Sequence, residues 1–78
     1  MNAAQCKMAR AALGWGVRDL AQKARVSTQT ISRLEHGQTL RQVTVNSIRA
    51  AFEAAGIEFI EENGGGPGVR FAKRRTAP

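Results

Sequence analysis

The sequence is poor in the features that mark secreted and membrane proteins. Its 78 residues include one cysteine, so no disulfide can form within the chain, which fits a reducing compartment. No apolar run approaches the roughly 18 residues that a membrane span requires. The chain also does not start with the charged and apolar leader of a secreted protein. We therefore expect no membrane contact and a cytoplasmic location.

The sequence also lacks the residue combinations of catalytic, metal and phosphate-loop sites. His36 is the only histidine and has no second ligand nearby, which argues against a metal site. One histidine and six scattered acidic residues assemble neither a Ser–His–Asp arrangement nor a pair of catalytic carboxylates. The stretch GGGPG at 64–68 is not followed by GK[ST], so it predicts a turn rather than a phosphate loop. We predict no enzyme activity, no cofactor and no metal.

Positive charge is present in excess and is unevenly placed along the chain. The formal net charge is +6, and 78 residues allow one small domain with a thin core, for which a partner chain is a plausible support. Residues 1–50 carry eight basic and two acidic side chains, whereas residues 51–68 carry four acidic and none basic. This layout favours one face that binds a polyanion and another that avoids it. The alternative is an ordinary basic protein whose charges are only solvated.

Three helices are predicted in the first half of the chain from their start and stop signals. Asn2 and Gln5 form a capping box for a helix over about 3–13, which Gly14 ends. Cys6 lies on the inward stripe of this helix and is expected to be a buried structural thiol. A second helix follows over 17–24, and Ser27 caps a third that ends at a left-handed Gly37.

The second half predicts one more helix and a β-hairpin. Residues 38–43 are expected to form a loop in which Leu40 and Val43 turn inward, and Thr44 is expected to cap a fourth helix that Gly56 ends. The period then changes to two on either side of the glycine turn, which is typical of a hairpin. The predicted fold is mainly α, a four-helix helix-turn-helix bundle with a C-terminal β-hairpin.

The hairpin divides the predicted domain organisation. Residues 1–56 complete a helical domain, 57–73 form the hairpin, and 74–78 form a basic, flexible tail. A lone two-stranded hairpin is marginal in water, so its apolar residues need a partner surface. Two partner surfaces meet this need: the hairpin covers its own helices, or its edge pairs with a second copy in a homodimer. We favour the dimer, and its expected contact residues are Ile57, Phe59, Ile60, Val69 and Phe71.

The second and third helices are close enough in sequence to form a helix-turn-helix. Small Ala21 allows the helices to approach, and apolar residues lock their crossing; these are Leu20, Val26, Ile31 and Leu34. A generic helical hairpin needs the same apolar positions. It does not need four polar residues on one exposed face of the third helix, which are Thr28, Gln29, Ser32 and Arg33. This face favours DNA in the major groove.

The stretch LAQKARVSTQTISRLEHG resembles the Cro/phage-repressor type of helix-turn-helix, the XRE family, and the resemblance covers about residues 5–55. It implies a helical bundle that binds a palindromic operator in double-stranded DNA, usually as a homodimer. The third helix would read bases through Thr28, Gln29, Ser32 and Arg33. Arg10 and Glu35 match a pair that often forms a salt bridge, and Arg10 lies on an inward stripe where an unpaired charge would be costly.

The residues expected to contact the DNA backbone are Arg18, Lys23, Ser27, Thr30, His36 and Arg41. The chain departs from the family pattern at two places. Gly16 and Val17 replace the usual Ser or Thr and Gln, so a phosphate contact is lost unless Arg18 or backbone N–H groups at this helix end replace it. Arg25 replaces the glycine of the turn, where a positive φ would cost on the order of 1 kcal/mol.

The resulting functional hypothesis is a small dimeric regulator of transcription, a repressor or autoregulator, which is at the nucleoid when bound to DNA. Two alternatives use the same module. One is an antitoxin whose hairpin or tail also binds a toxin, and the other is an interaction adaptor that has lost DNA binding. A protein partner of either kind, toxin or antiactivator, is not identified by the sequence.

Overall fold

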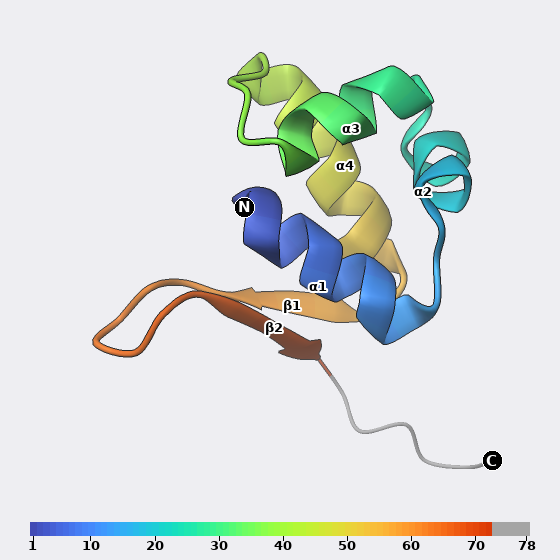
Figure 1. Cartoon of the computed structure of the whole chain (residues 1–78). Coiled ribbons are helices and arrows are strands. Elements are labelled where there is room, and N and C mark those ends of the chain that lie inside the picture. The colour runs from blue at the N-terminus through green and yellow to red at the C-terminus, as the bar shows by residue number, and fades with distance from the viewer. Residues whose placement is uncertain (73–78) are drawn as a thin grey trace, which may run out of the picture.

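The computed structural model describes residues 1–72 and consists of four helices followed by a two-stranded antiparallel sheet (Figure 1). The elements are α1 (Ala3–Leu13), α2 (Val17–Ala24), α3 (Thr28–Glu35), α4 (Gln42–Ala54), β1 (Ile57–Ile60) and β2 (Gly68–Phe71). The predicted fold class is therefore confirmed. The basic tail expected at 74–78 lies outside the described residues. Within residues 1–72, no helix combines the length and the apolarity that a bilayer crossing requires.

Helix α1 begins and ends at the residues that the sequence indicated. The side-chain oxygen of Asn2 accepts a hydrogen bond from the Gln5 backbone N–H at 2.8 Å, and the Gln5 side chain accepts one from the Asn2 N–H at 3.0 Å. These reciprocal bonds satisfy N–H groups that have no partner inside the helix. Gly14 ends the helix in the left-handed region with a φ of 69°, where glycine has no steric penalty.

Helix α4 begins earlier than expected, so the prediction that Thr44 caps it was wrong. The N-cap is Arg41, and the Thr44 and Val45 N–H groups donate to its carbonyl at 3.0 and 3.1 Å. The start was missed because no side chain caps this helix. The inward turn expected for Val43 was also wrong, since this side chain is 64% exposed. Two residues before the partly buried Val45, it lies about 200° away around the helix and faces solvent.

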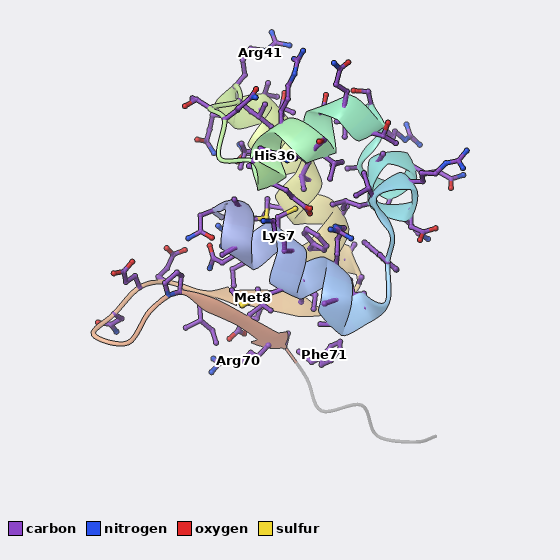
Figure 2. The ribbon with its side chains drawn as sticks, viewed as in Figure 1. Lys7, Met8, His36, Arg41, Arg70 and Phe71 are labelled. Atoms are coloured by element: carbon purple, nitrogen blue, oxygen red, sulfur yellow. The ribbon has the colours of Figure 1, made fainter. Side chains whose placement is uncertain are left out.

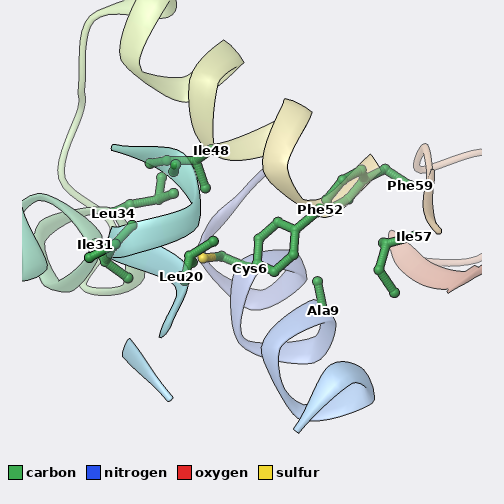
Figure 3. Close-up of a cluster of buried hydrophobic side chains, with 11 residues drawn as sticks. Cys6, Ala9, Leu20, Ile31, Leu34, Ile48, Phe52, Ile57 and Phe59 are labelled. Atoms are coloured by element: carbon green, nitrogen blue, oxygen red, sulfur yellow. The ribbon is translucent and has the colours of Figure 1, made fainter. Parts of the chain in front are cut away.

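The core lies between the helices and continues down to the sheet. Side chains from all four helices and from β1 form one buried cluster around Phe52 (Figure 3). The Phe52 ring stacks on Trp15 with centroids 5.8 Å apart and meets Phe59 edge-on at 5.9 Å. Aromatic pairs at these separations stabilise beyond the burial of their area. Because Ile57 and Phe59 belong to this cluster, the first hairpin strand and the helices share one core.

The hairpin has the predicted alternation of faces. Ile57 is opposite Phe71, and Phe59 is opposite Val69. Glu58 and Arg70 are opposite each other on the other face and form an ion pair. The sheet is held to α1 by the Gln5 side-chain amide, which donates to the carbonyls of Ile60 and Gly68 at 3.0 and 3.1 Å. A buried glutamine thus fixes the hairpin beneath α1 (Figure 1).

Candidate DNA-binding interface

The turn between α2 and α3 is tight and contains a strained residue. Arg25 has a φ of 59° and a ψ of 45°, and within residues 1–72 it is the only residue other than glycine with a positive φ. The Val26 N–H donates to the Ala21 carbonyl at 3.0 Å across the turn. Ala21 is 5% exposed, so its small side chain lies in the crossing of the two helices. The positive φ expected at Arg25 is confirmed.

Helix α3 starts with a cap that occupies two hydroxyl groups. The Ser27 Oγ accepts a hydrogen bond from the Thr30 N–H at 3.0 Å and lies 2.8 Å from the Thr30 Oγ. A serine N-cap of this kind contributes about 1 kcal/mol to helix stability. Both residues stand at the N-terminal end of α3, where the helix dipole favours a phosphate.

The two sides of α3 differ completely in burial. Ile31, Leu34 and Glu35 point inward and are at most 8% exposed. The structure brings the four expected base-reading residues together on the opposite, exposed side: Thr28, Gln29, Ser32 and Arg33. Spacing of three and four residues places them along a single face of the helix. Polar side chains of several lengths are thereby offered to solvent on a helix whose other side is fixed in the core.

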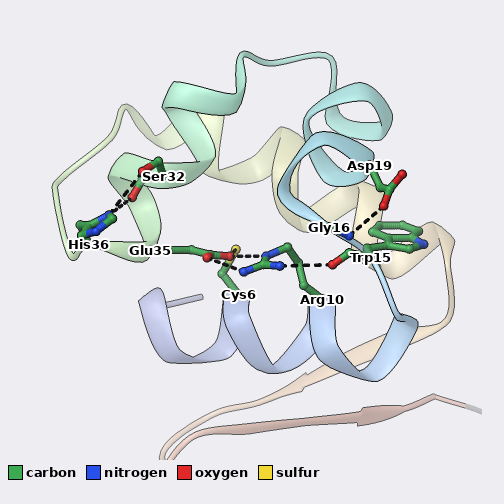
Figure 4. Close-up of polar contacts among 8 residues, drawn as sticks. All are labelled: Cys6, Arg10, Trp15, Gly16, Asp19, Ser32, Glu35 and His36. Carbon is green, nitrogen blue, oxygen red and sulfur yellow. Dashed lines mark hydrogen bonds and ion pairs between the residues drawn. The ribbon is translucent and has the colours of Figure 1, made fainter.

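Glu35 anchors the end of α3 to α1 through two donors (Figure 4). Arg10 donates from Nε and Nη2 to the two carboxylate oxygens of Glu35, both at 2.7 Å. The geometry is bidentate, which is the strongest arrangement for this pair. The Cys6 thiol lies 3.2 Å from the same carboxylate and donates to it. The hydrogen bonds from Arg10 lower the pKa of Glu35 below its ordinary value and keep it charged.

Arg10 and Cys6 complete this anchor in different ways. Arg10 also donates from Nη1 to the Trp15 carbonyl at 3.2 Å, so one guanidinium holds both α3 and the link between α1 and α2. Burial, together with the hydrogen bond to Glu35, raises the pKa of the Cys6 thiol to about 12. Cys6 is therefore a neutral donor rather than a reactive thiolate, as its inward position indicated. Its bond to Glu35 was not anticipated, because the two residues are far apart in sequence.

The N-terminus of α2 carries a residue that the sequence analysis missed. The Asp19 carboxylate accepts a hydrogen bond from the Gly16 N–H at 2.7 Å (Figure 4). The acid three residues after the cap position is the signal that would have identified it. This N–H is thus bonded within the protein, and the Asp19 carboxylate places a negative charge at the start of α2. Arg18 remains exposed on the first turn of the same helix.

Four other residues are expected to contact the DNA backbone. Arg18, Lys23, His36 and Arg41 are exposed. The ammonium of Lys23 lies 5.9 Å from the centre of the Trp15 ring, a weak cation–π contact. His36 places Nδ1 2.7 Å from the Ser32 carbonyl at the end of α3. Figure 2 shows Arg41 projecting from the loop beside α3, away from the sheet.

Comparison with known proteins identifies the module. A family model described as helix-turn-helix (HTH_3) matches residues 7–61, which is more than half of the chain. A comparison with curated protein sequences found no match. The matched range contains α2, α3 and the turn at Arg25, together with Arg10 and Glu35. The chain therefore belongs to the HTH_3 helix-turn-helix family, the Cro/C1-type or XRE family, and this family implies DNA binding.

Proposed function

We propose that the protein is a sequence-specific regulator of transcription that binds a palindromic operator as a homodimer and represses the gene it occupies. Domains of this family are typically non-catalytic. The observation that carries the proposal is the exposed face of α3, with Thr28, Gln29, Ser32 and Arg33, on a helix whose other side is anchored by Glu35. A rigid polar face is what reading of base edges in the major groove requires.

Within this face, two side chains have clear base preferences. Gln29 and Arg33 are four residues apart, one turn along α3, and reach neighbouring base pairs. Arginine forms two hydrogen bonds to guanine O6 and N7, and glutamine forms two to adenine N6 and N7. Thr28 at the helix start is short and offers a methyl group to thymine or a hydroxyl group to phosphate. Two recognition helices related by a two-fold axis would read half-sites centred about 10 base pairs apart.

The basic residues supply affinity that does not depend on sequence. Lys23 and Arg41 are exposed, and cations that contact phosphates release counterions from DNA on binding. His36 at the end of α3 is a further proposed backbone contact. Asp19 at the start of α2 weakens the contact of that helix end with phosphate. We therefore assign the phosphate contacts on this flank to the Arg18 side chain rather than to backbone N–H groups.

The experiment is a titration of the protein against labelled DNA from upstream of its own gene and against a scrambled duplex of the same composition. We expect the upstream DNA to bind at least 1,000-fold more tightly, as specific sites generally do. The variant with both Gln29→Ala and Arg33→Ala should lose this difference while it retains binding to the scrambled duplex. Equal affinity of the wild-type protein for both duplexes would refute the proposed function.

A further inference from the structure

His36 lies in line with the exposed polar face of α3, one turn beyond Ser32. Its backbone N–H donates to the Ser32 carbonyl at 3.0 Å, so the helical path continues to this residue. At about 100° per residue, His36 lies roughly 40° from Ser32 and roughly 20° from Gln29 around the helix axis. The side chain of His36 is exposed. DNA held against this face of α3 would therefore lie close to the imidazole ring.

The imidazole ring is tied to α3 through one of its two nitrogens (Figure 4). Nδ1 lies 2.7 Å from the carbonyl oxygen of Ser32. A carbonyl oxygen only accepts hydrogen bonds, so Nδ1 carries the hydrogen and donates it. The Ser32 hydroxyl is farther from Nδ1, at 3.4 Å, and does not take this hydrogen from the carbonyl. The neutral ring therefore has its lone pair at Nε2.

The second ring nitrogen, Nε2, is the one left for a partner outside the protein. Within residues 1–72 no group bonds it, and the ring is exposed. A phosphate oxygen, like a carbonyl oxygen, only accepts hydrogen bonds. A neutral Nε2 would therefore turn its lone pair toward a phosphate, whereas a protonated Nε2 donates a charge-assisted hydrogen bond. A phosphate contact through this atom requires a proton that the neutral ring does not have.

No carboxylate in the described residues compensates a positive charge on His36. Glu35, its neighbour in the chain, is bonded to Arg10, and Asp19 on α2 is bonded to the Gly16 N–H. The other acidic residues belong to 53–62, and within residues 1–72 none of them pairs with His36. The remaining charged side chains on α1, α2, α3 and the loop after α3 are exposed cations: Lys7, Arg18, Lys23, Arg25, Arg33 and Arg41. A DNA phosphate is therefore the anion that would compensate a proton at Nε2.

We propose that DNA binding takes up one proton per chain at His36, so that the protein binds DNA more tightly as the pH falls below neutrality. The proton comes from solvent and forms Nε2–H, which donates to a phosphate oxygen while Nδ1–H stays bonded to the Ser32 carbonyl. Histidine suits this coupling, because it is the side chain whose charge ordinarily changes between about pH 5 and 8. Its place at the C-terminal end of α3 also favours a cation. The inference rests on the proposed function, of which it uses the phosphate contact of His36 but not the reading of bases.

The test is DNA binding at pH 6 and pH 8, at one salt concentration, by the wild-type protein, His36→Gln and Arg41→Ala. Linkage relates the change of affinity with pH to the protons taken up, so we expect the wild-type affinity per chain to be about fivefold higher at pH 6. His36→Gln should lose most of this difference. Arg41→Ala is the matched control, because it removes another expected phosphate contact but no group that titrates in this range; it should keep the difference while binding more weakly at both pH values. A wild-type protein without the difference, a His36→Gln variant that keeps it or an Arg41→Ala variant that lacks it would each overturn the inference.

A second measurement reports on the ring directly and needs no variant. His36 is the only histidine, so the nitrogen chemical shifts of its ring are unambiguous in NMR spectra. We expect the neutral ring of the free protein to carry its hydrogen at Nδ1, and the titration of the ring to move to higher pH when the protein is saturated with DNA. A neutral ring with its hydrogen at Nε2, or a titration that DNA leaves unchanged, would overturn the inference.

The outcome is separable from that of the proposed function, because a phosphate contact does not depend on base sequence. The scrambled duplex should therefore cause the same proton uptake as the upstream DNA. Proton uptake on both duplexes without a preference for the upstream DNA refutes only the proposed function. Specific binding of the upstream DNA without proton uptake refutes only the inference about His36.

Discussion

Replacing Arg25 by glycine should stabilise the protein. Its left-handed backbone, with a φ of 59°, costs a residue with a Cβ about 1–2 kcal/mol. Glycine avoids this cost but loses about 0.5–1 kcal/mol through the greater freedom of its unfolded chain. Within residues 1–72 the Arg25 side chain has no hydrogen bond or ion pair that the change would remove. We expect the free energy of unfolding to rise by roughly 0.5–1 kcal/mol.

The assay is thermal unfolding followed by circular dichroism. For a domain of this size, 1 kcal/mol corresponds to about 4–8 °C, so Arg25→Gly should raise Tm by roughly 2–8 °C. Arg25→Ala is the matched control, because alanine removes the charge but keeps the Cβ and hence the strain. Its stability should stay within about 0.5 kcal/mol of the wild-type value. Both variants lose one cation and should weaken DNA binding to the same small extent.

Two results would refute this reasoning. If Arg25→Ala stabilised the protein as much as Arg25→Gly, the gain would come from removal of charge repulsion rather than from relief of strain. If Arg25→Gly destabilised the protein, the arginine side chain would hold a contact worth more than the backbone strain. Thermal unfolding of the two variants side by side separates these cases.

Three substitutions and one chemical modification test the site further. Arg33→Ala should weaken operator binding by about 1–3 kcal/mol and remove the base preference at one position of each half-site. Binding to single-base variants of the operator measures this preference, and an unchanged preference would show that Arg33 does not read a base. Arg41→Ala should weaken all duplexes equally and lower the salt slope by about one, and an unaltered slope would mean that it makes no phosphate contact. The hydrogen bonds from Arg10 lower the pKa of Glu35 in the folded protein. Glu35 therefore stabilises the fold fully above its unfolded pKa and loses this contribution as pH falls through the folded pKa. The Glu35→Gln variant should therefore be less stable than the wild-type protein at pH 7 by roughly 2–3 kcal/mol, and it should lose less stability on acidification. Equal pH profiles of Tm for the variant and the wild-type protein would contradict this prediction. Cys6, fully buried with its pKa raised to about 12, should resist iodoacetamide at pH 8 until the protein unfolds, and rapid alkylation of the folded protein would show that the core opens there.

Much of the helical part could be predicted because its signals are local. Asn2, Gly14 and Ser27 mark helix ends through bonds to residues at most four positions away, and such bonds are readable from spacing alone. The positive φ of Arg25 could be predicted because the family turn has glycine at that position. The start of α4 could not, since its first turn forms on Arg41 without any side-chain cap.

The contacts around Glu35 were predictable only in part. The resemblance implied its pairing with Arg10, but the bond from Cys6 depends on how α1 crosses α3. The bond from Arg10 to the Trp15 carbonyl depends on the path of the chain after α1. Spacing within a helix assigns a residue to a face and leaves its partner on another element open. Asp19 differs, because its bond to the Gly16 N–H is local and could have been recognised in the sequence.

The anchor at Glu35 explains how so short a helix can hold a fixed polar face toward solvent, as the proposed reading of DNA requires. Helix α3 has eight residues, and isolated helices of this length are not stable in water. Its order must come from its inward side, where Ile31 and Leu34 are buried and Glu35 is held by two hydrogen bonds from Arg10. Because Arg10 also bonds the Trp15 carbonyl, a shift of α3 would disturb the link to α2 as well. The outward residues of α3 can therefore be substituted without loss of the geometry that presents them, because buried residues on the other side of the helix maintain that geometry.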